Sequence, residues 1–265
     1  MAEKDYLEIN ARLSIMSSCF YQPTWAQQFS SFLTVAESTR LGGVGQAPYK
    51  SLNLGLFTEE DDAVVKENRQ IFCTALGWDV PQLAGGYQVH GDQVLRVHRP
   101  GQWQGYDAFM TNRAEVLLSV TIADCTPVLI FDPVQRAVGA AHAGWRGTVA
   151  GIAGKLLRNM RDAYSTKASD CWAFVGTCIG KEDYEVDEDV ATHFQEDFKR
   201  WDEKRGKYLL DLKGANSMAL RQIGVRAEQI EVSGFSTVQH NDRYFSHRAE
   251  KGKTGRMLAV IGLRC

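Results

Sequence analysis

Two short apolar runs joined by a turn constrain the fold of this chain more than any other feature. Residues 128–131 and 137–141 flank an Asp-Pro-Val-Gln segment at 132–135, in which proline fixes its own backbone and aspartate can bond to nearby amides. The pattern predicts a β-hairpin. A hairpin that is symmetric about the centre of this segment places Cys125 directly opposite His142, with Cβ atoms roughly 4.5–5.5 Å apart on one face. That spacing suits two ligands of one metal ion, or a thiol beside its base.

His90 is a third candidate ligand. The segment 86–92 alternates and then reaches glycine, which is typical of a strand that runs out into a loop, with His90 at its end. Two imidazoles and one thiolate form a donor set that open catalytic zinc sites use while a fourth position stays available for water or substrate. Spacing alone does not recruit His90, and a cysteine in an apolar run is often a small core residue. From the residues alone, a metal site, a Cys–His pair and ordinary core packing remain alternatives.

Length, charge and cysteine content exclude several classes of protein. The chain has 265 residues, of which 44% are hydrophobic, enough for one sizeable core. A net charge of −2 argues against binding nucleic acid or an anionic membrane through bulk charge, and no apolar run is long enough to span a bilayer. The six cysteines are scattered without a CxxC pair, which is typical of a reducing compartment. We therefore expect a cytoplasmic protein with neither nucleic acid nor a membrane as a partner.

Hydrophobic periodicity predicts mixed α and β structure. No segment is rich enough in Pro, Gly or Ser to divide the chain into domains. The helix expected after the Gly-Trp-Arg-Gly turn at 144–147 has Thr148 as its predicted N-cap. Its predicted buried stripe consists of Val149, Ile152, Leu156, Met160 and Ala163. The other predicted helices cover 62–76, 189–200 and 214–223, and the predicted strands cover 115–123, 171–175, 229–233 and 257–263.

A series of short motifs runs from about residue 25 to the end of the sequence. Besides ADCTP (123–127) and AHAGWRG (141–147), they are STRLGG (38–43), YKSLNLG (49–55), ENR (67–69), QVHG (88–91), DAFMT (107–111), CIG (178–180), YEV (184–186), FSHR (245–248) and TGRM (254–257). In this set the chain resembles the multicopper polyphenol oxidase (laccase-domain) family, also called the peptidoglycan-editing-factor family. The chain departs from the family pattern at three places. The family usually has Pro where Thr177 stands, Cys-Thr where Ser236-Thr237 stands, and an aromatic residue where His247 stands.

The resemblance implies a fold that the composition and periodicity do not reach. The expected class is α+β, with a single domain built as a four-layer α/β/β/α sandwich with mixed β-sheets. The catalytic domain would cover residues 25–265, and residues 1–24 would form an N-terminal extension or a first helix.

The resemblance also implies a zinc site and a reaction. His90, Cys125 and His142 match the family residues that bind a catalytic zinc ion. The implied activity is phosphorolysis of purine nucleosides, namely adenosine, inosine and 5′-methylthioadenosine, to the base and ribose 1-phosphate, with some deamination of adenosine. The partners would then be small molecules, a purine nucleoside and phosphate, and we expect a monomer or a small homo-oligomer.

Arginines in the motifs are candidates for holding phosphate, because the guanidinium fork matches phosphate oxygens. Arg146 is the preferred catalytic candidate, since two glycines bracket it just after His142. Arg40, Asn53 and Arg248 are the candidate substrate-binding residues. Asp124 could orient a metal ligand, as carboxylates commonly do.

Three alternatives accompany the zinc enzyme. A full laccase cluster needs on the order of ten histidines and the chain has six, so zinc is preferred, although copper could occupy the single site. A Cys–His amide hydrolase with Cys125 as nucleophile and His142 as base could edit UDP-N-acetylmuramoyl-serine in peptidoglycan synthesis. A non-enzymatic, zinc-stabilised binding module would need a fourth protein ligand, for which His247 is the candidate.

Overall fold

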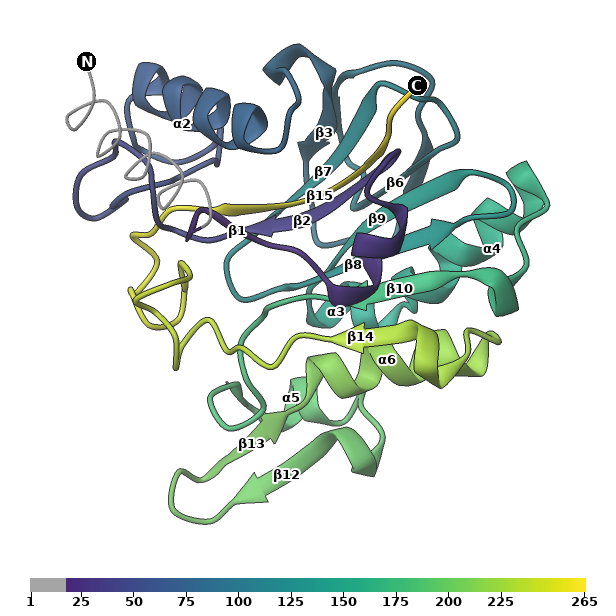
Figure 1. The fold of residues 1–265 in the computed structure, drawn as a ribbon. Helices are drawn as coiled ribbons and strands as arrows, with labels where there is room; N and C mark the ends of the chain where they lie inside the picture. Colours follow the sequence, from purple (N-terminus) through teal and green to yellow (C-terminus); the bar gives the residue numbers. More distant parts are fainter. Residues whose placement is uncertain (1–17) are drawn as a thin grey trace.

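Two mixed β-sheets packed face to face form the body of the protein (Figure 1). The computed structural model describes residues 18–265. In order across the first sheet lie β1 (Phe20–Tyr21), β2 (Leu33–Ser38), β15 (Met257–Leu263), β7 (Val116–Ile122), β3 (Leu83–Tyr87) and β5 (Gly101–Gln104). In order across the second lie β14 (Ile230–Val232), β10 (Trp172–Val175), β8 (Thr126–Asp132), β9 (Ala137–Ala143), β6 (Ala108–Thr111) and β4 (Val94–Arg96).

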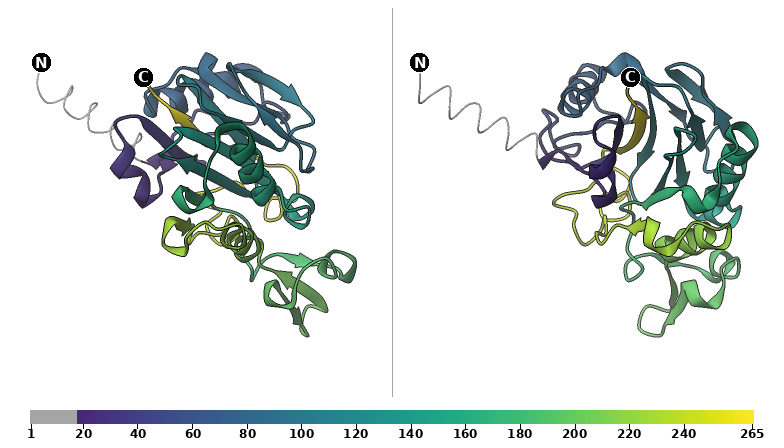
Figure 2. Two further views of the ribbon diagram at one scale, coloured as in Figure 1. Left: turned by 90° about the vertical axis from the view of Figure 1, so that its right-hand side faces the viewer. Right: turned by 45° about the vertical axis from the view of Figure 1, so that its right-hand side comes forward.

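Helices cover the outer faces of both sheets. Helix α2 (Asp62–Ala75) packs on the first sheet, where its Phe72 joins the outward-facing Leu117 of β7 in one buried cluster. Helices α4 (Ile152–Tyr164) and α6 (Leu212–Gln222) cover the second sheet (Figure 2). Alternate residues of the strands, such as Leu118 of β7, point between the two sheets and form the central core. The expected four-layer α/β/β/α sandwich in one domain is therefore confirmed.

The segment predicted as a helix over 189–200 is instead mostly irregular and extended, so that prediction is wrong. The structure has a single helical turn, α5 (Glu188–Ala191), a 3-10 turn and then strand β12 (Lys199–Asp202). With β13 (Lys207–Leu210) and β11 (Glu185–Val186), β12 forms a small third sheet. Cross-strand pairing, which includes contact between the Trp201 and Tyr208 rings, outweighs the local helical pattern.

The helix after β9 begins differently from the prediction. A short helix, α3 (Trp145–Val149), starts directly after Gly144, so Thr148 lies inside it and is not an N-cap. The chain then turns at Gly151, whose φ of 73° suits glycine, and α4 starts at Ile152. Of the predicted stripe, Ile152, Leu156 and Met160 are fully buried, whereas Val149 is exposed.

The central hairpin exists, but its register differs by two residues from the symmetric one. Pro127 lies opposite His142, and the turn comprises residues 133–136. Asp132 sets this turn, which lies one residue later than the symmetric one, because its Oδ1 accepts hydrogen bonds from the amides of Val134 (2.9 Å) and Gln135 (3.0 Å). A shift of two residues keeps every side chain on its original face. Cys125, just before β8, therefore stays on the face that carries His142.

Residues 1–17 of the predicted N-terminal extension lie outside the described part of the chain. Phe20–Tyr21, within the same extension, forms the edge strand β1 and pairs with β2. Among residues 18–265, no helix has both the length and the apolar character needed to cross a membrane.

Candidate functional site

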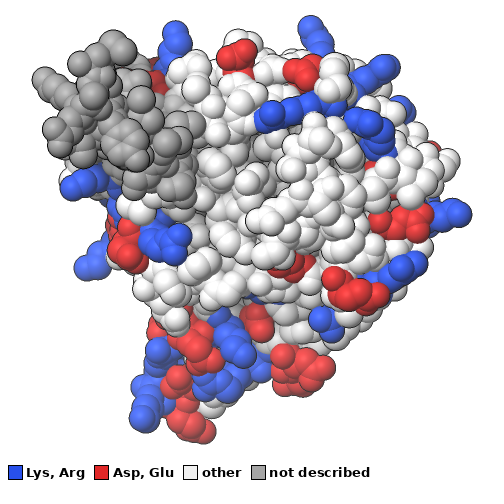
Figure 3. Space-filling view, viewed as in Figure 1, with Lys and Arg blue, Asp and Glu red and all other residues white. Residues whose placement is uncertain are grey.

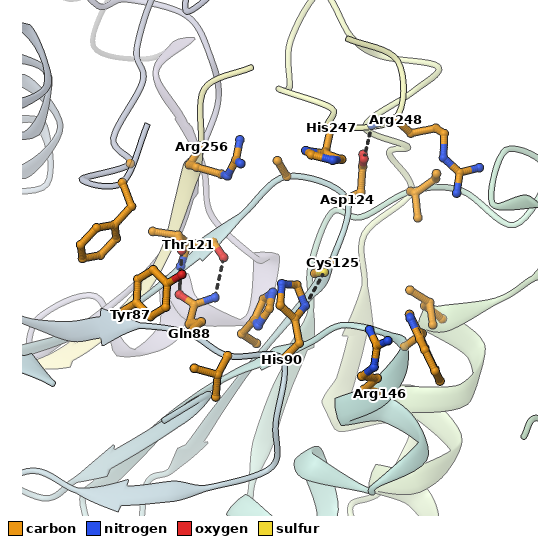
Figure 4. A pocket seen from close by; sticks show the side chains of 18 of the residues that line it. Tyr87, Gln88, His90, Thr121, Asp124, Cys125, Arg146, His247, Arg248 and Arg256 are labelled. Atoms are coloured by element: carbon orange, nitrogen blue, oxygen red, sulfur yellow. Dashed lines mark hydrogen bonds between the residues drawn. The ribbon is translucent and has the colours of Figure 1, made fainter. Parts of the chain in front are cut away.

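Three side chains from different elements converge at one edge of the sandwich. His90 comes from the loop after β3, Cys125 from the connection between β7 and β8, and His142 from β9. One ligand atom from each lies within 4.8 Å of the other two, and Cys125 Sγ is 3.9 Å from His90 Nδ1 (Figure 4). Two imidazole nitrogens and one thiolate sulfur are a donor set that suits zinc, and also copper. The residues present therefore fit a single metal ion.

A buried carboxylate holds two of these ligands in place. Asp107 Oδ1 accepts a hydrogen bond from Nδ1 of His142 (2.8 Å), which leaves Nε2 of that ring for a metal ion. The same carboxylate accepts the amide hydrogens of Val89, His90 and Gly91, at 3.1, 3.0 and 2.8 Å. Burial pushes the pKa of Asp107 upward, but the His142 and Gly91 hydrogen bonds outweigh it and hold that pKa below its usual range. Metal-binding histidines commonly have such a carboxylate partner.

The Cys125 thiol is prepared to act as a thiolate. Burial alone would raise its pKa, but the neighbouring imidazoles of His142 and His90 lower it to about 6. Burial opposes a charge on His142, yet the Cys125 thiolate and Asp107 raise the pKa of that imidazole. Gly144 leaves room for the cluster, since a methyl group added there would lie 3.0 Å from both Cys125 Sγ and His90 Nδ1.

Asp124 has a different role from the expected one of orienting a ligand. Its Oδ1 accepts hydrogen bonds from the hydroxyls of Thr237 (2.6 Å) and Ser246 (2.7 Å), and its Oδ2 accepts the amide hydrogen of Arg248 (2.7 Å). The residue has a φ of 86°, so the chain turns sharply just before Cys125. Asp124 therefore fixes the loop that carries His247 and Arg248 beside the candidate ligands.

The cluster opens into a cleft of about 760 Å³. Arg146, Arg248 and Arg256 line this cleft together with the three candidate ligands. Arg146 is exposed, with its guanidinium carbon 4.3 Å from the centre of the Trp145 ring. Figure 4 shows Arg146 and Arg248 on one side of the cluster and Arg256 on the other. The cleft can therefore hold an anion next to a metal-activated group.

Two of the predicted substrate-binding residues lie elsewhere. The Arg40 guanidinium donates hydrogen bonds to the carbonyls of Lys50 and Asn241 and to the carboxylate of Glu250, so its donors are used by the protein. Asn53 is fully buried and accepts the amide hydrogen of Arg256 (2.8 Å). Neither side chain lines the cleft, so the expectation of direct substrate contact is corrected for both. Arg248 lines the cleft as expected.

Sequence reasoning missed Asp107 and Arg256 as site residues. Arg256 is positioned by Asn53 and by Gly55, where an added methyl group would lie 2.7 Å from Arg256 Cγ. Burial lowers the pKa of Arg256. Both residues lie within the quoted motifs DAFMT and TGRM, but only the fold shows that these motifs reach the cluster.

No fourth protein ligand joins the three among residues 18–265. His247 lines the cleft but does not belong to the cluster. An open coordination position facing a cleft is characteristic of catalytic metal sites, whereas structural zinc is normally enclosed by four protein ligands.

Comparison with known proteins places the chain in a family. The family model described as multi-copper polyphenol oxidoreductase laccase matches residues 34–264. The chain belongs to this laccase family. A relative from Bacillus subtilis named purine nucleoside phosphorylase YlmD is 34% identical over 257 residues, which cover 91% of this chain and 92% of that protein. Another from Deinococcus radiodurans, named purine nucleoside phosphorylase, is 41% identical over 230 residues, covering 86% and 88% of the two chains.

Two solved structures that are more than 30% identical to this chain have the same fold. The crystal structure of YlmD from Geobacillus stearothermophilus matches with a TM-score of 0.85 and 32% identity, over 94% of this chain and 100% of that one. The crystal structure of the Bacillus licheniformis hypothetical protein YfiH matches with a TM-score of 0.86 and 31% identity, over 93% and 97%. Within the described residues of this member of the laccase family, one cluster of three side chains that could hold a metal ion is present. Its donors suffice for a single ion.

Proposed function

We propose that this protein is a zinc-dependent purine nucleoside phosphorylase that also deaminates adenosine. Its substrates would be adenosine, inosine and 5′-methylthioadenosine, with the free base and ribose 1-phosphate as products. The observation that carries the proposal is the His90–Cys125–His142 cluster, which lacks a fourth described ligand and opens into an arginine-lined cleft. The relatives from Bacillus subtilis and Deinococcus radiodurans, both named purine nucleoside phosphorylase, support the same reaction.

The chemistry divides between an ion and the arginines. When bound, zinc supplies a Lewis acid that polarises an oxygen atom and makes water more acidic. In phosphorolysis, a phosphate oxygen forms a bond to C1′ of the ribose, the bond between C1′ and the base nitrogen breaks, and its electron pair leaves with the base. Arg146 and Arg248 would hold the phosphate where water would otherwise attack, because phosphorolysis and hydrolysis differ only in the attacking group.

A second candidate, the Cys–His amide hydrolase, also has an observation in its favour. His142 lies between Cys125 and Asp107, an order of thiol, imidazole and carboxylate that activates cysteine nucleophiles in other enzymes. In this reading Cys125 attacks the amide carbonyl of a substrate such as UDP-N-acetylmuramoyl-serine, the C–N bond breaks, and serine leaves as the amine after taking a proton from His142. Water then hydrolyses the thioester and frees Cys125. The metal and the nucleophile use the same thiolate, so the two readings exclude each other while the ion is bound.

Metal removal and product analysis distinguish these readings. Untagged protein should contain about one zinc ion per chain by elemental analysis, and base release from inosine should require phosphate. A chelator should abolish this activity reversibly, and added zinc should restore it, because the ligands bind the ion only as the folded set. Ribose 1-phosphate should appear in proportion to the free base.

Several outcomes would reject the proposal. Phosphate-independent base release would mean hydrolysis of the nucleoside. Full activity in a preparation shown to be metal-free, together with trapping of Cys125 by an alkylating agent, would favour the hydrolase. Copper in place of zinc in the purified protein would favour redox chemistry instead.

The proposal includes a cellular location and an assembly state. A zinc-binding thiolate benefits from a reducing compartment, and the scattered cysteines of the sequence suit one, so we place the enzyme in the cytoplasm. We expect a monomer or a small homo-oligomer acting on small molecules, with neither nucleic acid nor a membrane as a partner.

A further inference from the structure

An exposed apolar rim borders one end of the cleft. It consists of Leu56, Phe57, Tyr87 and Val89, whose exposed fractions are 38%, 62%, 47% and 51%. The Phe57 and Tyr87 rings meet edge to face, with centroids 4.9 Å apart and an interplanar angle of 89°. Figure 4 shows Tyr87 on one side of His90 and Cys125, with Arg146 and Arg248 on the other. The cleft therefore has an aromatic end and a cationic end, and the metal ligands lie between them.

Phe57 and Tyr87 do not contribute to the packing of the hydrophobic core formed by residues 18–265. The Tyr87 hydroxyl has no hydrogen-bond partner in the described part of the chain, and Phe57 belongs to none of the buried clusters formed there. Exposed large apolar side chains gathered at a cleft mark a binding surface more often than scattered ones do. Phe57 and Tyr87 are therefore available to a ligand.

The side-chain amide of Gln88, between Tyr87 and Val89, is bound mainly to Thr121. Gln88 Oε1 accepts from the amide and the hydroxyl of Thr121, both at 2.7 Å, and Gln88 Nε2 donates to the Thr121 carbonyl at 2.9 Å. Both bonds that Oε1 accepts and one of the two Nε2 hydrogens are therefore used within the protein. A ligand at this end of the cleft thus meets mainly aromatic and aliphatic surface, with the Tyr87 hydroxyl and the second Gln88 Nε2 hydrogen as nearby polar groups.

We infer that Phe57 and Tyr87 form the nucleobase subsite of the cleft, an inference that rests on the proposed phosphorylase function. The base stacks against the Tyr87 ring with Phe57 along its edge, the ribose lies over the metal ligands, and phosphate binds at Arg146 and Arg248. Stacking uses the π-face that 6-amino and 6-oxo purines share. A site built on stacking discriminates weakly between such bases, whereas a site built on buried hydrogen bonds rejects the wrong one.

Alanine substitutions test the subsite. Tyr87→Ala and Phe57→Ala should each raise the KM for inosine and for adenosine roughly tenfold, since the stacked surface is lost. The KM for phosphate and the zinc content should not change. Tyr87→Phe keeps the ring and should retain the wild-type KM. The matched control is Trp201→Ala, which removes an exposed aromatic residue from another edge-to-face ring pair, on β12 outside the cleft.

A binding measurement separates this inference from the phosphorylase proposal. Hypoxanthine should bind to the zinc-loaded wild type in calorimetric titrations without phosphate, and the affinity should fall roughly tenfold in Tyr87→Ala. That loss would support the subsite even if no base release were observed. Unchanged KM and affinity in both alanine variants would overturn it. So would a fall in the sedimentation-derived mass of Phe57→Ala, because a second copy of the chain would then cover the rim.

Discussion

Asp107 determines how the candidate metal ligands are oriented. Its carboxylate bonds to the His142 ring and to the amides that flank and include His90, so one side chain orients a ligand on β9 and the loop of another. His90 has a φ of 58°, a conformation that non-glycine residues rarely adopt. The three amide bonds to Asp107 offset the cost of that conformation.

Replacement of Asp107 by asparagine should weaken metal binding while leaving the three ligands in the chain. Asparagine retains one acceptor oxygen but loses the charge that favours the required His142 tautomer. We expect the zinc affinity to fall about 10- to 100-fold, as measured by competition with a chromophoric chelator. The Asp107→Asn variant should still give a cooperative unfolding transition.

Asp92 offers the matched control for this change. It lies next to Gly91 in the same loop but forms an ion pair with Lys155 at 2.8 Å and contacts no ligand residue through its side chain. Asp92→Asn should retain the wild-type zinc affinity. Equal losses in both variants would mean that general loop charge, and not the Asp107 contacts, governs metal binding.

At the scale of elements, the β8–β9 hairpin positions Cys125, just before β8, and His142, on β9, in the cluster. Gly144 directly follows β9. Gly144 has φ −70° and ψ 177°, which alanine adopts without strain. Gly144→Ala should therefore leave the backbone intact while its methyl group pushes against Cys125 Sγ and His90 Nδ1. We expect a loss of zinc affinity of about tenfold or more, measured by the same chelator competition.

The control for Gly144 is a glycine with free space around it. A methyl group added at Gly234 would have no heavy atom within 4 Å, so Gly234→Ala should bind zinc as the wild type does. A wild-type zinc affinity in Gly144→Ala would show that the ligands can move apart without penalty.

The β8–β9 hairpin also shows which features of the fold can be predicted from the sequence. Its two apolar runs and its turn were predictable, because apolar periodicity and turn residues are local signals. Its register was not, because the turn is one residue later than the symmetric reading and depends on which amides Asp132 accepts. Because the register differs by two residues, each side chain stays on its predicted face of the hairpin, and Cys125 and His142 still lie close together.

Other site features depended on contacts between distant segments. Spacing linked Cys125 to His142, while His90 was only a candidate until the family resemblance assigned it to the same site. Asp107 lies 35 residues from His142 in the sequence, and no local sequence pattern predicts the hydrogen bond between them. Arg40, like Arg248, lies in one of the family motifs, but its guanidinium donates hydrogen bonds to backbone carbonyls and to Glu250. Burial and partner choice, which decide such roles, are properties of the fold.

At the scale of the whole molecule, a buried carboxylate links the two sheets. Glu37 belongs to β2 of the first sheet and is fully buried. Its carboxylate accepts the amide hydrogen of Thr177 (2.7 Å) and bonds to the Thr177 hydroxyl, just after β10 of the second sheet. That hydroxyl also contacts Ser233 Oγ (2.7 Å), which follows β14. Burial raises the pKa of Glu37 to about 7, against smaller opposing effects of Thr177 and Lys213.

The raised pKa of Glu37 predicts a pH-dependent stability. The folded state holds the proton more tightly than the unfolded chain, so this stabilisation is complete below pH 4.5 and is lost as the pH rises to about 7. Glu37→Gln removes that titration. The free energy of unfolding of the variant, relative to wild type, should therefore rise between pH 5 and 8, by roughly 3 kcal/mol.

Urea denaturation of the metal-free proteins across that pH range measures this difference. Glu196→Gln serves as the control, because the Glu196 side chain is 88% exposed and pairs only with Lys199. Its stability difference from wild type should be the same at every pH. A flat difference for Glu37→Gln as well would mean that Glu37 is ionised in the folded protein throughout the range.

The position of β15 has a consequence for how the protein is made. β15 lies between β2 and β7 in the first sheet and pairs with both, although it is synthesised long after either. The earlier strands must therefore wait, with their edges unpaired, until residues 257–263 have left the ribosome. Such distant pairings close slowly and expose apolar surface in the meantime. During synthesis, the first sheet is therefore completed late, when β15 inserts between β2 and β7.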